Sequence, residues 1–366
     1  MKRLLAYLFI VLGLGLVVNF NANAACKVHL GDFDWDSANV HTAITSLILE
    51  EGYGCEVQVT KGSTTPIMTA LFDQQIDVLT EVWRDNLSSM IETNVSKGNI
   101  IELGINTPSS TQGFYVDRAT AQKYNLKHVD DLRRPEIAKL FNNRLVSCIS
   151  GWTCYTINLV KLKVYDLDRY YENYDPGSGG ALDATIIKAF KKNKPILTYY
   201  WTPTGLLGGF DLVKLKEPKY NSGCWNKMMR VVQDIKAKGP SAYKDTCACE
   251  YIDMQLTKAA SKNFVNNPSN RAVIDFLKKY TLDTSEVNKQ LAYYMWESGG
   301  DMKKVAKNFL RTSDIWLDWI PYEVAKNVSS SVGKTMLAKK EPKKKKKKKK
   351  VVKVVEPEQE EIKVKT

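Results

Sequence analysis

Between residues 27 and 82 the sequence alternates between strand patterns and helical patterns, and this alternation constrains the fold more than any other feature. Short apolar or alternating runs typical of strands cover 27–31, 55–59 and 77–82. Apolar residues at helical spacing cover 37–51, and a shorter helix is expected over 66–74. The order strand, helix, strand, helix, strand is typical of one half of a doubly wound α/β sheet.

A second set of such elements follows residue 112. Strands are predicted at 113–116, 145–148 and 195–200, with helices at 130–141 and 182–191. From about residue 221 the pattern becomes mainly helical. The fold class is therefore predicted to be α/β, and the roughly 300 residues between the two ends of the chain suffice for two separate cores.

The first residues have the order of features found in a secretory signal peptide. Lys2 and Arg3 give a positive start, an apolar run covers 4–18, and Ala22-Asn23-Ala24 forms a small-x-small cleavage site. We therefore predict a signal peptide over 1–24 and export of the chain. A membrane anchor and a lipid-modified Cys26 are the alternatives, although the apolar run is shorter than the ~20 residues that a spanning helix needs.

The net charge of +13 comes mostly from the two ends of the chain. Residues 334–366 hold 14 lysines and 5 acidic residues, and Lys2 and Arg3 add two positive charges, which leaves the remainder at +2. Such a near-neutral body lacks the electrostatic footprint of a nucleic-acid binder. The lysine-rich segment 339–366 is predicted to be a disordered tail, because it repels itself and has little apolar mass.

All seven cysteines lie after the predicted cleavage site, so export permits disulfides. Cys148 and Cys154 are the best local pair, and Cys26 fits Cys55 if both begin neighbouring strands. Cys224 then pairs with Cys247 or Cys249, and an odd thiol remains. A zinc site at Cys247-Ala248-Cys249 is the alternative, but only three scattered histidines are available as partners.

Four tryptophans stand at or just after predicted strand ends. They are Trp35, Trp83, Trp152 and Trp201. Open α/β sheets bind ligands beyond the carboxyl ends of their strands, so four core tryptophans at equivalent ends are a poorer explanation than one shared binding site. Indole faces attract a quaternary ammonium through the ring quadrupole, at about 0.5–2 kcal/mol per ring, and bury its methyl groups. The tryptophans therefore predict a cage for a small methylated-ammonium solute.

Five stretches of the sequence have the pattern of one known family: 77–83, Ser-Thr-Gln-Gly-Phe-Tyr-Val-Asp at 110–117, 131–141, Cys-Ile-Ser-Gly-Trp-Thr-Cys at 148–154, and Tyr-Tyr-Trp-Thr-Pro at 199–203. Through them the chain resembles the periplasmic glycine betaine-binding proteins of ABC importers, within the wider betaine, choline and carnitine family. The resemblance runs from about residue 27 to 201 and more weakly to 264.

The resemblance implies roles for particular residues. Trp83, Trp152 and Trp201 match the three cage rings of the family, and Trp35 matches a fourth wall in the choline-binding members. The backbone N–H groups of Thr153 and Cys154 match positions that hold the carboxylate of the ligand. A Cys148–Cys154 disulfide would fix that loop.

Two departures bear on the identity of the ligand. Leu87 stands where betaine-binding members can place a carboxylate-binding histidine, and Arg84 is a candidate substitute as anion partner. Glu81 lies two residues before Trp83, hence on the same side of a strand, and we predict that it contributes to the ligand site. Asp34 and Asp36 flank Trp35 directly.

The resemblance further implies a two-lobed periplasmic-binding-protein fold of type II with the ligand in the interlobe cleft. Lobe 1 is expected from 26–110 with 225–330, and lobe 2 from 111–224. The expected partners are the onium ligand and an ABC permease in the inner membrane, for a periplasmic monomer without cofactor or metal. Glycine betaine is the first candidate ligand, and choline, trimethylamine N-oxide or another onium solute is the alternative.

Two other classes of function are weaker hypotheses. An enzyme acting on a methylated amine would need a nucleophile or base, and no such motif is present. A surface-interaction protein would depend on the lysine-rich tail.

Overall fold

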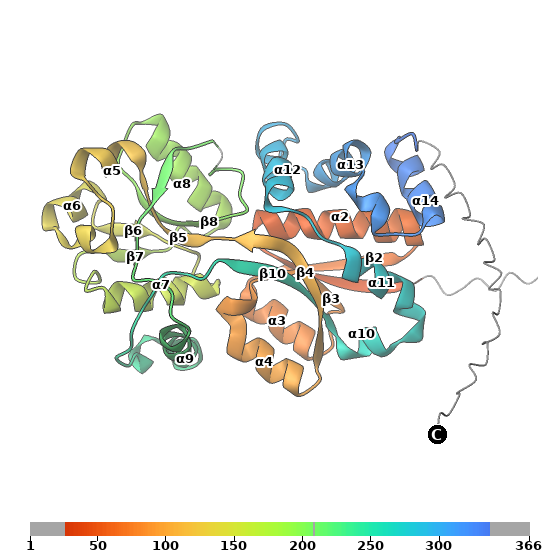
Figure 1. Cartoon of the computed structure of the whole chain (residues 1–366), viewed down its shortest axis with the longest axis horizontal. Coiled ribbons are helices and arrows are strands. Elements are labelled where there is room, and N and C mark those ends of the chain that lie inside the picture. The colour runs from red at the N-terminus through yellow and green to blue at the C-terminus, as the bar shows by residue number, and fades with distance from the viewer. Residues whose placement is uncertain (1–25, 208, 337–366) are drawn as a thin grey trace, which may run out of the picture. The chain divides into compact units, whose positions relative to one another are not determined.

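The computed structural model describes residues 26–207 and 209–336 (Figure 1). The predicted signal peptide at 1–24 and the predicted tail at 339–366 lie outside these residues. The chain divides into one compact unit that ends at Lys334 and a second that begins at Thr335, and the description below concerns the first. None of the helices in the described part has the length and apolarity needed to cross a lipid bilayer.

One five-stranded sheet carries the first tryptophans. Its strand order is β2-β1-β3-β10-β4. β1 pairs parallel with β2 and β3, whereas β10 is antiparallel to both β3 and β4. The bounds are β1 Lys27–Phe33, β2 Glu56–Gly62, β3 Val78–Val82, β4 Ile100–Ser110 and β10 Met254–Ser261.

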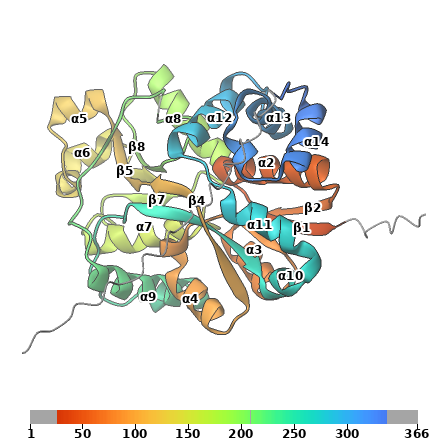
Figure 2. The same ribbon diagram turned by 45° about the vertical axis from the view of Figure 1, so that its right-hand side comes forward.

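Helices cover both faces of this first sheet (Figures 1 and 2). One layer has α2 against the sheet with three C-terminal helices packed on it: α2 Asp36–Tyr53, α12 Thr284–Trp296, α13 Met302–Thr312 and α14 Tyr322–Val332. The opposite layer holds α3 Thr64–Phe72 and α4 Ser88–Ser96, with the 3₁₀ helix η1 Arg84–Leu87 between β3 and α4. The short helices α10 Lys262–Asn266 and α11 Arg271–Lys279 follow β10.

A second five-stranded sheet, ordered β7-β6-β8-β5-β9, forms the other lobe. β6 is parallel to β7 and β8, and β5 is antiparallel to β8 and β9. The strands are β5 Gln112–Asp117, β6 Arg144–Val146, β7 Glu172–Tyr174, β8 Leu197–Trp201 and β9 Leu212–Lys214. The helices are α5 Arg118–Tyr124, α6 Pro135–Leu140, α7 Thr153–Val164, α8 Gly179–Lys191 and α9 Ser222–Lys238.

The chain passes from the first sheet to the second at Thr111, between β4 and β5. The expected return at residue 225 falls inside α9, which packs against α7 below the second sheet (Figure 1). The first sheet resumes only at Met254, the start of β10. We therefore propose that lobe 2 extends beyond 224 and that the return lies between α9 and β10.

Most predicted elements of the first 200 residues are present, but one expected helix is divided. The helix expected over 130–141 is split into a 3₁₀ turn at Val129–Arg133 and α6, because Arg134 precedes Pro135 and takes an extended conformation. The pattern expected after 221 is confirmed as mainly helical. Within it the sequence does not predict β10, in which antiparallel pairing with two neighbours overrides weak strand propensity.

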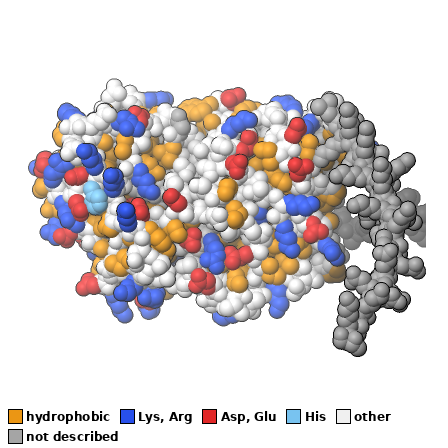
Figure 3. All heavy atoms as spheres, viewed as in Figure 1, with side chains coloured by type: hydrophobic (Ala, Val, Ile, Leu, Met, Phe, Trp, Pro, Cys, Tyr) orange, Lys and Arg blue, Asp and Glu red, His pale blue; other side chains and the backbone are white. Residues whose placement is uncertain are grey.

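The surface agrees with the small net charge of the body. On the face shown in Figure 3, lysine and arginine side chains are interspersed with aspartate and glutamate side chains. This face carries no extended basic patch.

Candidate functional site

The four predicted tryptophans line one cavity between the two lobes, together with Thr153 and Cys154. Trp35 follows β1 and Trp83 follows β3, so these two come from lobe 1. Trp152 precedes α7 and Trp201 ends β8, so these two come from lobe 2. The structure thus brings together side chains that are up to 166 positions apart, and each is at most 8% exposed.

The rings stand as walls. Trp152 is nearly perpendicular to Trp35, with centroids 5.4 Å apart, and nearly perpendicular to Trp201 at 5.5 Å. Phe33 stacks on Trp35 at 4.5 Å, and Tyr199 stacks on Trp201 at 5.9 Å. Phe33 and Tyr199 therefore limit the orientations that Trp35 and Trp201 can take.

Three of these tryptophans occupy the position just before a helix, where a capping side chain usually stands. Trp35 precedes α2, Trp83 precedes η1 and Trp152 precedes α7, and none of them makes a side-chain cap. An indole has no hydrogen-bond acceptor, so it cannot satisfy the first N–H groups of the helix. Each of these three positions therefore offers a ring and a set of uncapped N–H groups together.

The start of α7 differs from the other two in its charge. The first turn of α2 contains Asp36 and that of η1 contains Asp85, whereas the first turn of α7 has no acidic residue. The Nζ of Lys236, from α9, donates to the Oγ1 of Thr153 at 3.0 Å. Lys236 forms no ion pair with a described residue, and burial lowers its pKa. A helix N-terminus beside an unpaired ammonium favours an anionic group.

The predicted disulfide between Cys148 and Cys154 is present. It ties the first turn of α7 to the segment after β6. Cys26 is bonded to Cys55, and Cys224 to Cys247, which leaves Cys249 as a buried thiol. The alternative zinc site at 247–249 is wrong, because Cys247 is bonded to Cys224. No group of three or more metal-ligating side chains occurs among residues 26–207 and 209–336.

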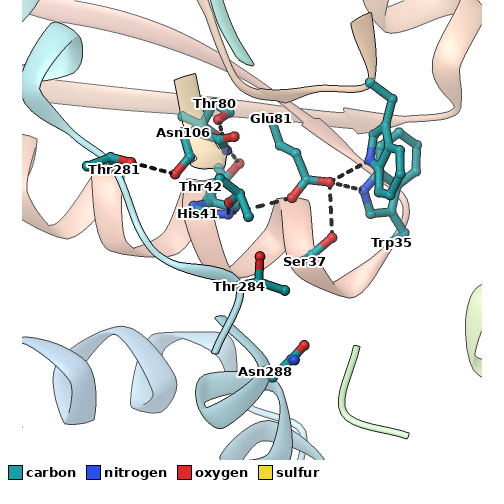
Figure 4. A network of polar contacts seen from close by, with 12 residues as sticks. Trp35, Ser37, His41, Thr42, Thr80, Glu81, Asn106, Thr281, Thr284 and Asn288 are labelled. Carbon is teal, nitrogen blue, oxygen red and sulfur yellow. Dashed lines mark hydrogen bonds and ion pairs between the residues drawn. The ribbon is translucent and has the colours of Figure 1, made fainter. Parts of the chain in front are cut away.

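Glu81 lies behind the cage rather than in it. Its Oε1 accepts hydrogen bonds from the indole N–H groups of Trp35 at 2.7 Å and Trp83 at 2.8 Å, and from the Ser37 hydroxyl at 3.0 Å (Figure 4). The side chain does not line the cavity. Burial raises the pKa of Glu81 to about 7, against the lowering effect of these three donors.

The second oxygen of Glu81 faces His41 of α2, at 3.6 Å between Oε2 and Nε2 (Figure 4). Burial lowers the pKa of His41 to about 3, so its imidazole is neutral near pH 7 and the contact is not an ion pair. His41 Nδ1 lies 2.6 Å from the Tyr280 hydroxyl. The carboxylate of Glu81 is therefore not neutralised by this neighbour.

Leu87 lines the cavity at the position where the resemblance implies a histidine in betaine-binding members. The suggestion that Arg84 replaces that histidine is wrong. Arg84 Nε pairs with Glu102 of β4 at 2.9 Å, and Arg84 does not line the cavity. Its charge is used within lobe 1.

Other residues that are not predicted from the sequence also line the cavity. The side chains of Asn86 and Gln112 bond to each other across the lobes at 3.0 Å, and the Tyr199 hydroxyl donates to Gln112 Oε1 at 2.7 Å. Tyr199 lies two residues before Trp201 on β8, so strand alternation would have placed both on one face. Phe33 and Thr64 also line the cavity, but no local pattern distinguishes them from core residues.

Comparison with known proteins agrees with this geometry. Residues 27–312 match the model of the family described as the substrate-binding domain of ABC-type glycine betaine transport systems. The chain belongs to this family. Family members are substrate-binding proteins of transport systems, and the fold is the type II periplasmic-binding-protein fold expected from the sequence.

A relative and two solved structures illustrate the likeness. The glycine betaine/proline betaine-binding periplasmic protein of Salmonella typhimurium is 33% identical over 125 residues, which cover 31% of this chain. The match spans only 38% of that relative's length. The glycine betaine/L-proline-binding protein of Borrelia burgdorferi superposes with a TM-score of 0.64 at 17% identity, covering 82% of this chain and 99% of that one. A choline-binding protein in complex with choline superposes with a TM-score of 0.63 at 17% identity, covering 84% of this chain and 98% of that one.

Proposed function

We propose that this chain captures a small methylated-ammonium solute, most readily glycine betaine, and delivers it to an ABC importer. The observation that carries the proposal is the cavity itself. It combines four indole walls with the uncapped N-terminus of α7. These two elements match the two ends of a zwitterion whose cation is methylated and whose anion is a carboxylate.

The tryptophan walls suit the cationic end. A trimethylammonium group cannot donate N–H hydrogen bonds, so it does not need hydrogen-bond acceptors in the site. Each desolvated ring contributes about 0.5–2 kcal/mol of attraction, and the rings also bury the methyl groups. Four rings are a sufficient source of affinity without any ion pair.

The start of α7 suits the anionic end. The N–H groups of Thr153 and Cys154 have no partner inside the helix, and the Cys148–Cys154 disulfide holds them in place. Lys236 does not line the cavity, but its Nζ lies 3.0 Å from Thr153 Oγ1 and acts on the start of α7 from behind. This pair of features favours glycine betaine over choline, which has no carboxylate.

Choline and trimethylamine N-oxide are the alternative ligands within the same class. Leu87 gives the cavity one hydrogen-bond donor fewer than a histidine would, which weakens the hold on a carboxylate. Ligands with a hydroxyl or an N-oxide oxygen would place that group near the same N–H groups.

The proposed setting follows the family. The exported protein acts in the periplasm as a monomer, closes on its ligand and docks on a permease in the inner membrane. No turnover is proposed, because a cage of rings supplies neither a nucleophile nor a base, and Cys154 is held in a disulfide. The lysine-rich tail has an accessory role at most.

Isothermal titration calorimetry of the purified protein tests the proposal. The panel is glycine betaine, choline, trimethylamine N-oxide, carnitine and dimethylsulfoniopropionate. We expect one binding site per chain, with the highest affinity for glycine betaine. The absence of binding to every member of the panel would overturn the proposal, and a preference for choline would overturn the role given to α7.

A further inference from the structure

Three of the four cage rings donate their indole N–H to a carboxylate. Trp35 and Trp83 share Glu81, and Trp152 donates to Asp34. Trp201 makes no such bond with a described residue. Carboxylate acceptors for three rings of one cavity are more than ring orientation requires, because backbone carbonyls would satisfy an indole N–H equally well.

We propose that Glu81 and Asp34 are positioning residues that make the cage selective for a cation, by fixing three rings and by placing negative charge directly behind them. This inference rests on the proposed function, since it assumes an onium group in the cavity. Neither carboxylate lines that cavity, so both act through the rings.

The geometry supports the positioning role of Glu81 first. One oxygen atom accepts from two rings that follow different strands, β1 and β3, and from Ser37 at the start of α2 (Figure 4). Glu81 is 1% exposed, so solvent does not compete for these bonds. A single buried atom therefore fixes the relative orientation of Trp35 and Trp83.

The charge has a second effect. A ring that donates its N–H to an anion gains electron density on its faces, and the anion itself attracts a cation on the other side of the ring. Little water intervenes to screen this attraction, since both rings are buried. An uncharged acceptor of the same shape would keep the orientation and lose this attraction.

Asp34 extends the arrangement across the lobes. It stands between β1 and α2 in lobe 1, whereas Trp152 belongs to lobe 2, so their hydrogen bond spans the interlobe cleft. The third ring is held in this way only when the lobes are together. Ring orientation and closure are coupled at this bond.

The test separates charge from shape by pairing two ligands. Glycine betaine and 3,3-dimethylbutanoate have the same shape and carboxylate, but the second has a carbon atom in place of the ammonium nitrogen. We expect Glu81→Gln to lower the affinity for glycine betaine by about tenfold. The affinity for 3,3-dimethylbutanoate, measured by competition, should stay within about twofold of the wild-type value. Equal losses for both ligands, or no loss for glycine betaine, would overturn the proposal.

A spectroscopic readout covers the case in which 3,3-dimethylbutanoate, whose trimethyl end is uncharged, binds too weakly to compare. Indole ¹H–¹⁵N resonances shift when a charged acceptor becomes neutral. Glu81→Gln should move the resonances of Trp35 and Trp83, Asp34→Asn that of Trp152, and neither that of Trp201. Unmoved resonances would contradict the charge-assisted bonds.

The control variant is Asp77→Asn, a partly buried carboxylate at the other end of β3 that accepts the His29 N–H. It should leave glycine betaine affinity unchanged. Wild-type protein that binds no onium ligand would refute the proposed function, whereas normal wild-type binding with an unchanged Glu81→Gln variant would refute only this inference.

Discussion

The carboxyl group of Glu81 titrates near neutral pH, because burial raises its pKa to about 7. Protonation removes the negative charge behind Trp35 and Trp83, so the cage attracts a cation less strongly below this pH than above it. We expect the dissociation constant of glycine betaine to rise several-fold between pH 8 and pH 6. Calorimetry over this range measures the effect, and a flat wild-type profile would contradict it.

Other titratable groups face Glu81 and must be separated from it. The charge of Asp32, on β1, raises the pKa of Glu81. His41 of α2 is neutral above pH 6, and Tyr280 is protonated throughout this range. Lys258 of β10 has its pKa lowered by burial to about 7 and acts on His41. The Glu81→Gln variant separates the two groups. If Glu81 alone causes the pH dependence, the dissociation constant of this variant should not change with pH, and any change that remains belongs to Lys258.

Among the elements, α7 has the largest expected effect on the anionic end of the ligand. Lys236→Met removes the ammonium beside Thr153. We expect a loss of about five- to tenfold in glycine betaine affinity and no loss for choline, because only the first has a carboxylate. The matched control is Lys227→Met, because Lys227 is an exposed lysine on α9, the helix that also carries Lys236. Equal effects of Lys236→Met on both ligands would exclude a carboxylate at this helix.

The disulfides provide a second test at this scale. Removing the Cys148–Cys154 disulfide by a double substitution to alanine should lower the free energy of unfolding by about 2 kcal/mol. It should also lower the affinity for glycine betaine, because the start of α7 is no longer fixed. The same change at Cys26 and Cys55 should cost about 3 kcal/mol, for a longer loop, and leave affinity unchanged. Chemical denaturation and calorimetry measure the two quantities. Equal affinity losses would contradict a specific role for the 148–154 loop.

The sequence predicts those parts of the fold whose signal is local. β1, α2, β2, α3 and β3 follow from alternation and helical spacing, and the four tryptophans follow from their position at strand ends. β10 does not follow, because its stretch Met-Gln-Leu-Thr-Lys-Ala-Ala-Ser is poor in β-branched residues and carries a lysine. Its stability comes from pairing with β3 and β4, and from Lys258, which donates to the carbonyls of Ile105 and Tyr280.

The site divides in the same way. Trp35, Trp83, Trp152 and Trp201 were found because each has a recognisable position, and Thr153 and Cys154 because of the resemblance. The sequence predicts Glu81 beside the ligand, whereas in the structure it accepts hydrogen bonds from the indole N–H groups of Trp35 and Trp83. The Asn86–Gln112 amide pair joins two lobes, and Lys236 arrives from α9. Contacts between distant segments of this kind leave no local pattern in the sequence.

At the scale of the whole molecule, closure of the two lobes is supported by hydrogen bonds that cross between them. The Thr204 N–H, in the loop after β8, donates to Asn288 Oδ1 of α12 at 2.8 Å. We expect Asn288→Ala to weaken glycine betaine about threefold to tenfold by faster dissociation, since the bond exists only with the lobes together. Lys289→Ala is the control, because Lys289 is the exposed residue next to Asn288 on α12. Stopped-flow fluorescence measures both rates, and an unchanged dissociation rate would contradict the role of this bond in closure.

The central claim is that the four tryptophans hold the ligand, and one calorimetric titration tests it most directly. Glycine betaine is titrated into Trp201→Ala, with Trp296→Ala as the control because Trp296 is 60% exposed and outside the cavity. Loss of one wall should weaken binding about a hundredfold, while the control stays within about twofold of the wild type. A Trp201→Ala variant that is folded, by its thermal melt, and binds glycine betaine as tightly as the wild type would contradict the account.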